Sequence, residues 1–250
     1  LRSLSQWHER WAFCGASAAV MHGLDCSYRQ LHPIHVAVGR NSRPRNQRYV
    51  RFHVLDDAET VAVDGARVTS ILRTLVDCAA MMPRRYAMAP IDSALRQGKT
   101  TVEQMLEYVD AIPMLRDRER IRAVLAQGDG RVENGGESEC RAVLDELGFP
   151  VHRVQVEFPC LSHPGRVHRV DFLWERDDGT LIAGEFDGVQ KYVDPLMTAG
   201  RTIRQVVYDE RDLQQCLSRR GVDMVRMFYR DLDNAQVLAY RLEQARVPRR

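Results

Sequence analysis

The sequence predicts a two-domain protein of the α/β (α+β) class, in which helices flank β-sheets. Two observations support this prediction. Apolar residues recur at helical spacing in some segments and form short strand-like runs in others. Four glycines fall within residues 127–136 and interrupt both patterns, because glycine is favourable in turns and costly inside regular elements. We therefore expect a domain at 1–126, a glycine-rich linker at 127–136 and a second domain at 137–250.

The smaller first domain is expected to combine strands with helices. The apolar stretch 11–21 and the pattern at 16–24 predict a first helix that ends at a glycine turn. A hairpin is expected around Asp64-Gly65, and Thr69 or Ser70 is the candidate cap of the helix that follows. The other expected elements are strands at 34–38 and 49–55, a helix with apolar residues at 71, 72, 75, 76 and 79, and helices at 89–96, 102–109 and 116–126.

The second domain is expected to be a mixed sheet flanked by helices, because its elements follow the order α-β-β-β-α-β-α. Gly148 is the expected end of its first helix. The expected elements are a helix at 138–147, strands at 153–158, 169–174 and 181–187, a long helix at 198–219, a strand at 224–228, and a final helix from Asp231 or Asp233 to about 245.

Composition excludes several classes of protein. Hydrophobic residues make up 44% and charged residues 28%, as in ordinary globular proteins, and the net charge of +2 does not mark a general nucleic-acid binder. No run of about 18 apolar residues occurs, so we expect no membrane span and a cytoplasmic location. The six cysteines form no C-x-x-C pair and have no histidines at zinc-finger spacing, so we expect scattered reduced thiols.

Acidic residues lie within two of the expected strands. Glu185 and Asp187 are two residues apart, so their side chains share one face of a strand, and Asp171 on a neighbouring strand brings a third carboxylate near. Crowded carboxylates repel one another, and a divalent cation such as Mg²⁺ or Mn²⁺ removes that conflict. The pattern therefore indicates a metal-dependent phosphodiesterase. The alternative is a solvated edge residue at 185 and an ordinary turn at Asp187-Gly188.

Short motifs follow one another through the second domain. They are Glu137-Ser138, Gly148-Phe149-Pro150, Gln155-Val156, Val170-Asp171-Phe172, Glu185-Phe186-Asp187-Gly188 and Gly221. In this order and spacing, residues 137–232 resemble the PD-(D/E)XK nuclease superfamily, and within it the very-short-patch-repair-like endonuclease branch. The resemblance implies a restriction-endonuclease-like sheet and Mg²⁺-dependent cleavage of DNA.

The same resemblance implies roles for matched residues. Asp171 and Glu185 are the expected metal ligands, and Glu137 the expected support of the metal or its water. A typical member has lysine two residues after the second acid, where this sequence has Asp187. Lys191 is therefore the candidate charge stabiliser or water activator.

Arginines gather in one loop of the first domain. Five of them fall within twelve residues that contain no acid: Arg40, Arg43, Arg45, Arg48 and Arg51. Guanidinium groups bind phosphate through two hydrogen bonds, so we predict nucleic-acid contacts at Arg43, Arg45 and Arg48, and at Arg211 on the long helix. The alternatives are a solvated hairpin loop for the first three and a surface of ion pairs for Arg211.

Two motifs mark the first domain, Gly-Ala-Ser-Ala-Ala-Val-Met-His-Gly-Leu at 15–24 and Val-Thr-Ser-Ile-Leu-Arg-Thr-Leu-Val-Asp at 68–77. Over about residues 8–98 the sequence resembles AbiEi-like antitoxins of abortive-infection systems, which implies a toxin or defence-system partner. The leading hypothesis is a metal-dependent DNA endonuclease that acts against foreign DNA. The alternative is a non-catalytic antitoxin or transcriptional regulator with a degenerate nuclease fold, which Asp187 at the lysine position favours.

Overall fold

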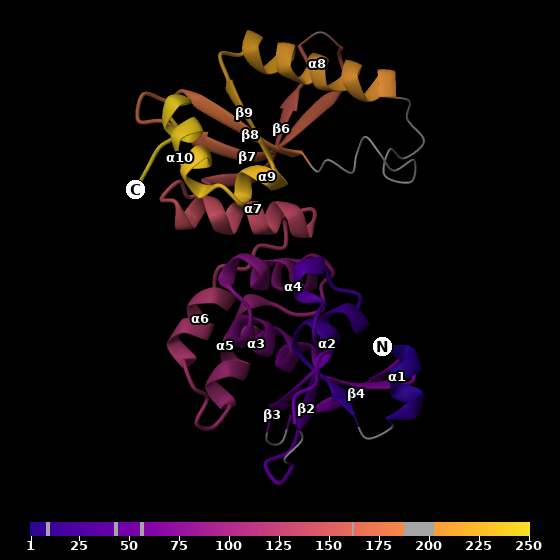
Figure 1. Ribbon diagram of the computed structural model, residues 1–250. Coiled ribbons are helices and arrows are strands. Elements are labelled where there is room, and N and C mark those ends of the chain that lie inside the picture. The colour runs from indigo at the N-terminus through magenta and orange to yellow at the C-terminus, as the bar shows by residue number, and fades with distance from the viewer. Residues whose placement is uncertain (9–10, 43–44, 56–57, 162, 188–202) are drawn as a thin grey trace. The chain divides into compact units, whose positions relative to one another are not determined.

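A computed structural model describes residues 1–8, 11–42, 45–55, 58–161, 163–187 and 203–250. The chain divides into two compact units, Leu1–Glu139 and Cys140–Arg250 (Figure 1). Each unit combines one mixed sheet with helices, which confirms the predicted fold class. No helix within the described ranges is both long enough and apolar enough to cross a membrane.

The N-terminal unit is built on a five-stranded sheet with the order β3-β2-β1-β5-β4. Its strands are β1 (Ala12–Phe13), β2 (Ile34–Val38), β3 (Val50–Val54), β4 (Thr60–Val63) and β5 (Ala66–Thr69). The predicted hairpin is confirmed, since β4 and β5 pair antiparallel across Asp64 and Gly65. Both turn residues have positive φ, at 49° and 79°, which is the backbone that a two-residue type I′ turn requires.

The expected helix over 11–21 is wrong at its start. Ala12–Phe13 form the central strand β1, and helix α2 (Gly15–Met21) begins after Cys14. Phe13 is fully buried and pairs with Val36 on one side and Val68 on the other. Pairing with two neighbouring strands therefore outweighs the helical spacing of the apolar residues, and Gly15, at φ +51°, turns the chain between the two elements.

The alternative interpretation of the arginine segment as a hairpin loop is wrong in its topology. Strands β2 and β3 run parallel, with Ile34 opposite Val50 and Val38 opposite Val54. Parallel neighbours require a crossover connection, so a tight hairpin turn between β2 and β3 is excluded.

Helices cover the sheet of the N-terminal unit on one side (Figure 1). The remaining helices of this unit are α1 (Arg2–Trp7), the short 3₁₀ helix η1 (Tyr28–Gln30), α3 (Ile71–Met81), α4 (Arg84–Arg96), α5 (Val102–Ala111) and α6 (Arg118–Leu125). Ser70 is confirmed as the cap of α3, because its side chain accepts a hydrogen bond from the Arg73 amide. Thr101 and Gln104 form a reciprocal capping box at the start of α5.

The C-terminal unit is built on a four-stranded sheet with the order β6-β7-β8-β9. Strands β6 (Arg153–Pro159), β7 (Val167–Glu175) and β8 (Leu181–Asp187) are antiparallel neighbours, and β9 (Asp223–Phe228) is parallel to β8. Helix α8 (Ile203–Arg219) lies between β8 and β9 in the chain, and so belongs to the crossover that a parallel pair needs. With α7 (Gly135–Glu146) before the sheet, the predicted order of elements is confirmed up to β9. The single final helix predicted from Asp231 or Asp233 is instead two helices, α9 (Tyr229–Leu232) and α10 (Ala235–Gln244).

The sheet of the C-terminal unit lies between α8 on one face and α7 on the other (Figure 1). On the α8 side, Leu173 and Ala183 belong to one apolar cluster with Leu217 of the helix. On the other side Trp174 is fully buried and its indole donates to the Phe149 carbonyl at 3.3 Å. Gly184 is required here, because a Cβ would lie 2.7 Å from the Trp174 ring.

Candidate functional site

A row of polar residues crosses the C-terminal sheet from edge to edge. Glu185 of β8 pairs directly with Arg226 of β9, and Asp171 of β7 lies one residue beyond the Phe172–Gly184 pair, toward Glu185. Gln155 of β6 lies between the pairs Val154–Phe172 and Val156–Val170, on the level of Asp171. The adjacent row is entirely non-polar: Val154, Phe172, Gly184 and Val225. We call Gln155, Asp171, Glu185 and Arg226 the polar row. Polar groups in such surroundings are costly unless they bind one another or a ligand, which makes the row the candidate site of this unit.

Asp171 is held in place by hydrogen bonds within the sheet. Its Oδ2 accepts from the Phe186 amide at 2.8 Å, and its Oδ1 accepts from the Gln155 side-chain amide at 3.4 Å. Gln155 has φ +53°, in the left-handed region that non-glycine residues rarely adopt. Such backbone strain is concentrated at functional sites, where the surrounding structure maintains it. The strained residue and its contact with Asp171 therefore mark this end of the row.

Arg226 joins the other end of the row to helix α8. Its guanidinium Nη1 lies 3.2 Å from Glu210 Oε2 on α8 and 3.6 Å from Asp187 Oδ2 on β8. Asp187 is buried, with 6% of its surface exposed, so the guanidinium supplies the positive charge that a buried carboxylate needs. One cation thus balances two acids from two different elements.

The carboxylates of the row are suited to a divalent cation only in part. Asp171 and Glu185 place hard oxygen donors on adjacent strands, and Mg²⁺ is commonly held by one or two carboxylates together with waters and substrate oxygens. Asp187 faces Arg226 instead. Among the described residues, Asp171, Glu185 and Asp187 do not bring three carboxylate oxygens within 4.8 Å of one another. Asp171 and Glu185 are therefore the residues that would hold an ion, and Asp187 would not be a ligand.

Glu137 caps its own helix in the N-terminal unit. Its Oε2 accepts from the Glu133 amide at 3.0 Å, and its own amide donates to Asn134 Oδ1 at 3.1 Å at the start of α7. This contact explains why an acid occupies the first turn of α7, where the helix dipole favours negative charge. Lys191 lies outside the described residues. The catalytic roles expected for both stay predictions.

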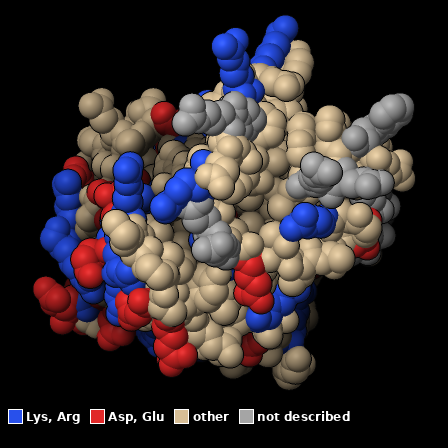
Figure 2. Space-filling view, turned by 90° about the horizontal axis from the view of Figure 1, so that it is seen from below, with Lys and Arg blue, Asp and Glu red and all other residues tan. Residues whose placement is uncertain are grey.

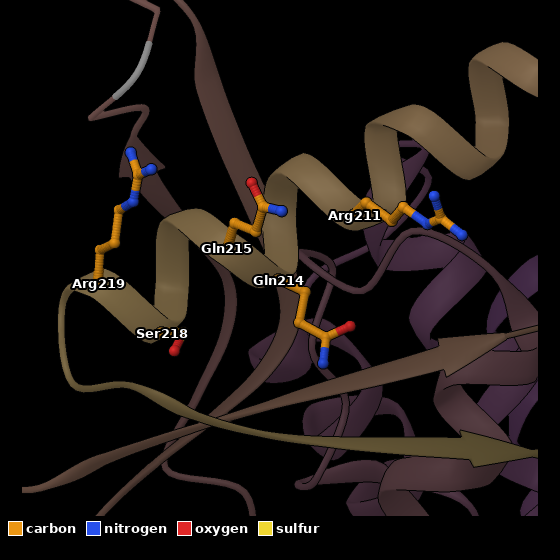
Figure 3. A pocket seen from close by; sticks show the side chains of 5 residues that line it. All are labelled: Arg211, Gln214, Gln215, Ser218 and Arg219. Atoms are coloured by element: carbon orange, nitrogen blue, oxygen red, sulfur yellow. The ribbon is translucent and has the colours of Figure 1, made fainter.

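Arg211 lies on the exposed face of α8. Together with other polar side chains spaced along the same helix, it lines a hollow of the surface (Figure 3). The lining residues are Arg211, Gln214, Gln215, Ser218 and Arg219. All five offer hydrogen-bond donors, and the two guanidinium groups add positive charge, so this face of α8 has the chemistry of a phosphate-binding surface.

The arginines of the β2–β3 connection are exposed where the structure describes them. Arg40, Arg45, Arg48 and Arg51 are open to solvent, and the Arg48 guanidinium lies 5.1 Å from the centre of the Tyr49 ring. Arg43 lies outside the described residues. Basic and acidic side chains are interspersed over the face of the molecule in Figure 2, so no single large basic patch covers that face. Nucleic-acid contacts of Arg45 and Arg48 stay predictions.

Comparison with known families finds a match in the N-terminal unit. Residues 11–127 match the AbiEi antitoxin C-terminal domain. The AbiEi match runs from β1 through α6, so it includes the whole five-stranded sheet and extends beyond the 8–98 likeness noted from the sequence. The antitoxin part of the predicted resemblance is thereby confirmed for this unit. The nuclease resemblance of the C-terminal unit stays a prediction.

The chain is also similar to an uncharacterized protein of Mycobacterium tuberculosis, in strains CDC 1551 / Oshkosh and ATCC 25618 / H37Rv. In each strain the two sequences are 28% identical over 213 residues, which cover 79% of this chain and 74% of the relative. Since 79% of 250 residues is about 198, and the first unit ends at Glu139, the similarity extends into the C-terminal unit. The relatives therefore share sequence outside the AbiEi match.

Sequence reasoning missed Arg226 and Glu210. A signal was present for Arg226, since it stands alone among the apolar residues Met224, Val225 and Met227 of an expected strand. A single arginine inside such a strand must meet acids from elsewhere. Glu210 had no comparable signal, because acids on an amphipathic helix are ordinarily solvated.

Proposed function

We propose that the protein is a cytoplasmic antitoxin-type regulator of a defence system, in which the N-terminal unit recognises a toxin partner and the C-terminal unit binds nucleic acid without cleaving it. The match of residues 11–127 to the AbiEi antitoxin C-terminal domain carries this proposal. Its family name denotes an antitoxin, and the match spans the complete sheet of the unit.

The contacts of the C-terminal unit support binding over cleavage. The acid at the usual lysine position, Asp187, is buried beside Arg226, and Asp171 is engaged by the Phe186 amide. In this arrangement Arg226 balances the charge of Asp187, and the Phe186 amide stabilises the carboxylate of Asp171. The exposed arginines of α8, Arg211 and Arg219, supply the positive charge that attracts a phosphate backbone.

The decisive experiment pairs this chain with the product of the gene beside its own. Expression of that neighbour alone is expected to arrest growth, and co-expression of the full chain is expected to restore it. A double variant, Asp171→Asn with Glu185→Gln, should restore growth equally well, because neutralisation by binding does not use these acids for chemistry. Rescue by the wild type but not by the double variant would contradict a non-catalytic antitoxin.

The nucleic-acid part of the proposal has its own measurement. Duplex DNA binding is measured by fluorescence anisotropy from 50 to 200 mM salt for the wild type, for Arg211→Gln and for a control, Arg153→Gln, whose side chain pairs with Glu175 on the surface. Loss of one phosphate contact should lower the slope of log K against log salt by about 0.9 in the Arg211 variant. An unchanged slope in that variant would remove α8 from the binding surface.

A second candidate function is a metal-dependent endonuclease. One observation favours it: Asp171 and Glu185 belong to the adjacent strands β7 and β8, each one residue beyond the paired residues Phe172 and Gly184. The test is nicking of supercoiled plasmid with Mg²⁺ or Mn²⁺. If this candidate is right, Asp171→Asn and Glu185→Gln each abolish metal-dependent nicking, whereas Glu175→Gln, a matched change at the exposed end of β7, retains it. Equal nicking by all four proteins would assign the activity to a contaminant and dismiss the candidate.

A further inference from the structure

A second cluster of ligand-type side chains, distinct from the polar row, lies where the β6–β7 hairpin meets helix α8. Two groups of three potential metal ligands share Cys160, and in each group the ligand atoms all lie within 4.8 Å of one another. The first group is Cys160, His168 and Cys216, all buried, and the second is Cys160, His163 and Asp212. They come from the β6–β7 hairpin and from the inner face of α8.

We propose that this cluster is a zinc site, in which Cys160, Cys216, His168 and His163 bind one Zn²⁺. In a tetrahedral zinc site, neighbouring sulfur and nitrogen ligands lie about 3.5 Å apart, as follows from Zn–S of about 2.3 Å and Zn–N of about 2.0–2.1 Å. Cys160 Sγ and His163 Nδ1 are 3.7 Å apart. The ligand atoms of the buried group, Cys160, His168 and Cys216, all lie within 4.8 Å of one another, and Cys160 is the residue that joins His163 to this group.

The surroundings of His168 point to a ligand. This histidine is buried, with 6% of its surface exposed. Its Nε2 makes no hydrogen bond to a described group but lies 3.4 Å from Asp212 Oδ2, so this nitrogen faces the acid and the other ring nitrogen is the one that would bind zinc. A histidine that binds zinc through one ring nitrogen ordinarily directs the other toward a carboxylate, and Asp212 is placed to serve as that outer carboxylate.

Asp212 itself is balanced by a cation. Arg166 Nη1 lies 3.2 Å from Asp212 Oδ2, and Arg166 Nη2 lies 2.7 Å from Asp209. Because this arginine already neutralises Asp212, the acid suits an outer position better than a ligand position. The charge of Zn²⁺ is then balanced by two thiolates. On binding, the thiols of Cys160 and Cys216 each lose a proton to solvent, while both histidines bind as neutral rings.

The site would join two elements that the fold must hold together. Cys160, His163 and His168 belong to the β6–β7 hairpin, and Cys216 belongs to α8, one turn after Asp212. Closure by zinc would fix α8 over the sheet, and with it Glu210, which contacts Arg226 of the polar row. A structural rather than catalytic zinc is expected, because four protein ligands leave no open position.

The experiment uses the full chain, purified in the presence of a reductant and dialysed against zinc. Bound metal is measured by mass spectrometry, and Co²⁺ titration reports tetrahedral thiolate ligation through its charge-transfer absorption. Cys160→Ser and Cys216→Ser test the ligands, and Cys140→Ser is the matched control, since Cys140 is fully buried in the same unit but contacts Met227 instead. Circular dichroism checks that each variant folds.

About one zinc per wild-type chain is expected, with loss of zinc and of the cobalt charge-transfer band in both ligand variants and full occupancy in the Cys140 control. Asp212→Asn, an outer-position change, should weaken zinc binding by about 10–100-fold without abolishing it. If a ligand variant fails to fold, His163→Gln at a half-exposed position serves in its place and should reduce affinity. A wild-type chain that retains no zinc, or ligand variants that bind zinc as tightly as the control, would overturn the proposal.

Discussion

The two units place arginine–carboxylate pairs beneath their surfaces in different ways. In the N-terminal unit, Arg73 and Asp77 lie one turn apart on α3, and Arg73 Nε is 2.8 Å from Asp77 Oδ1. Both side chains are largely buried, at 10% and 3% exposure. In the C-terminal unit, Arg226 of β9 meets Asp187 of β8 and Glu210 of α8. The first pair is made within one helix, whereas the second set exists only when three elements come together.

This difference separates a packing role from a binding role. A pair at i and i+4 forms whenever its helix forms. The Arg73–Asp77 pair is therefore explained by the mutual neutralisation of its two charges. The Arg226 set is held by tertiary structure and lies 3.2–3.6 Å apart, with one cation for two acids. A ligand that adds or removes charge can rearrange such a set, because neither acid has the cation to itself. The polar row is for this reason the better place for regulation or chemistry.

The largest effect in this comparison is expected from Arg226→Met. Removal of the guanidinium leaves Asp187 and Glu210 without their shared cation, and we expect the free energy of unfolding to fall by about 2–4 kcal/mol at neutral pH. Denaturant unfolding followed by tryptophan fluorescence measures it, since Trp174 is fully buried in the same unit. Arg153→Met, which breaks the exposed pair with Glu175, is the control and should cost under about 1 kcal/mol. Similar losses in the two variants would show that Arg226 is merely a surface ion.

A smaller and pH-dependent effect is expected from Arg73→Met. Burial raises the pKa of Asp77 to about 6, against the opposing effect of Arg73. When folding raises the pKa of an acid, the protein loses stability as pH increases from the pKa of the unfolded state through the pKa of the folded state. Without Arg73 that folded pKa rises further, so the deficit of the variant should grow from pH 5 to pH 7.5, where it reaches about 1–3 kcal/mol.

The matched control for this prediction is the double variant Arg73→Met with Asp77→Asn, which removes the titrating group. The stability of the double variant should not change through Asp77 between pH 5 and pH 7.5, so its deficit relative to the wild type should shrink as the wild type itself loses stability. If the deficit of the single variant does not grow with pH, Asp77 does not carry a buried charge in this unit, and the contrast with the Arg226 set no longer holds.

Much of the fold could be predicted because each element carries a local signal. The hairpin at Asp64-Gly65, the Ser70 cap and the β6–β8 strands follow from turn chemistry, capping and apolar runs. Strand β1 could not be predicted, because two residues are too few for a periodic pattern and their strand geometry comes from pairing with β2 and β5. The parallel pairing of β2 and β3 was hidden for the same reason, since direction is set by partners and not by the residues of the connection.

The candidate site could be predicted only along the sequence. Strand spacing placed Glu185 with Asp187, and adjacent strands brought Asp171 near Glu185. The partners of these acids depend on the order of strands, which no spacing reveals: Arg226 and Glu210 follow Glu185 by 41 and 25 residues. The Cys160–His168–Cys216 group was missed for the same reason, because zinc-finger spacing describes ligands on one short segment and not ligands joined by a sheet and a helix.

The smallest effect is expected at a histidine pair, which shows a third way to place titrating groups beneath the surface. His35 Nδ1 and His53 Nε2 are 2.9 Å apart, with stacked rings, on β2 and β3. Burial, with smaller effects of the neighbouring His53 and Arg51, lowers the pKa of His35 to about 4. When folding lowers the pKa of a base, the protein keeps its full stability above the unfolded-state pKa of about 6.5 and loses stability as pH falls toward 4. His35→Gln should therefore remove a loss of stability of about 1–2 kcal/mol that the wild type shows between pH 7 and pH 4.5.

The quantity to measure is the difference in the free energy of unfolding between wild type and variant at each pH, because Asp77 changes the stability of both proteins with the opposite sign in this window. His32→Gln, at an exposed histidine of the same unit, is the control. A difference that stays constant from pH 7 to pH 4.5 would mean that the pair is protonated as readily in the folded protein as in the unfolded chain, and that only the acids distinguish the two units.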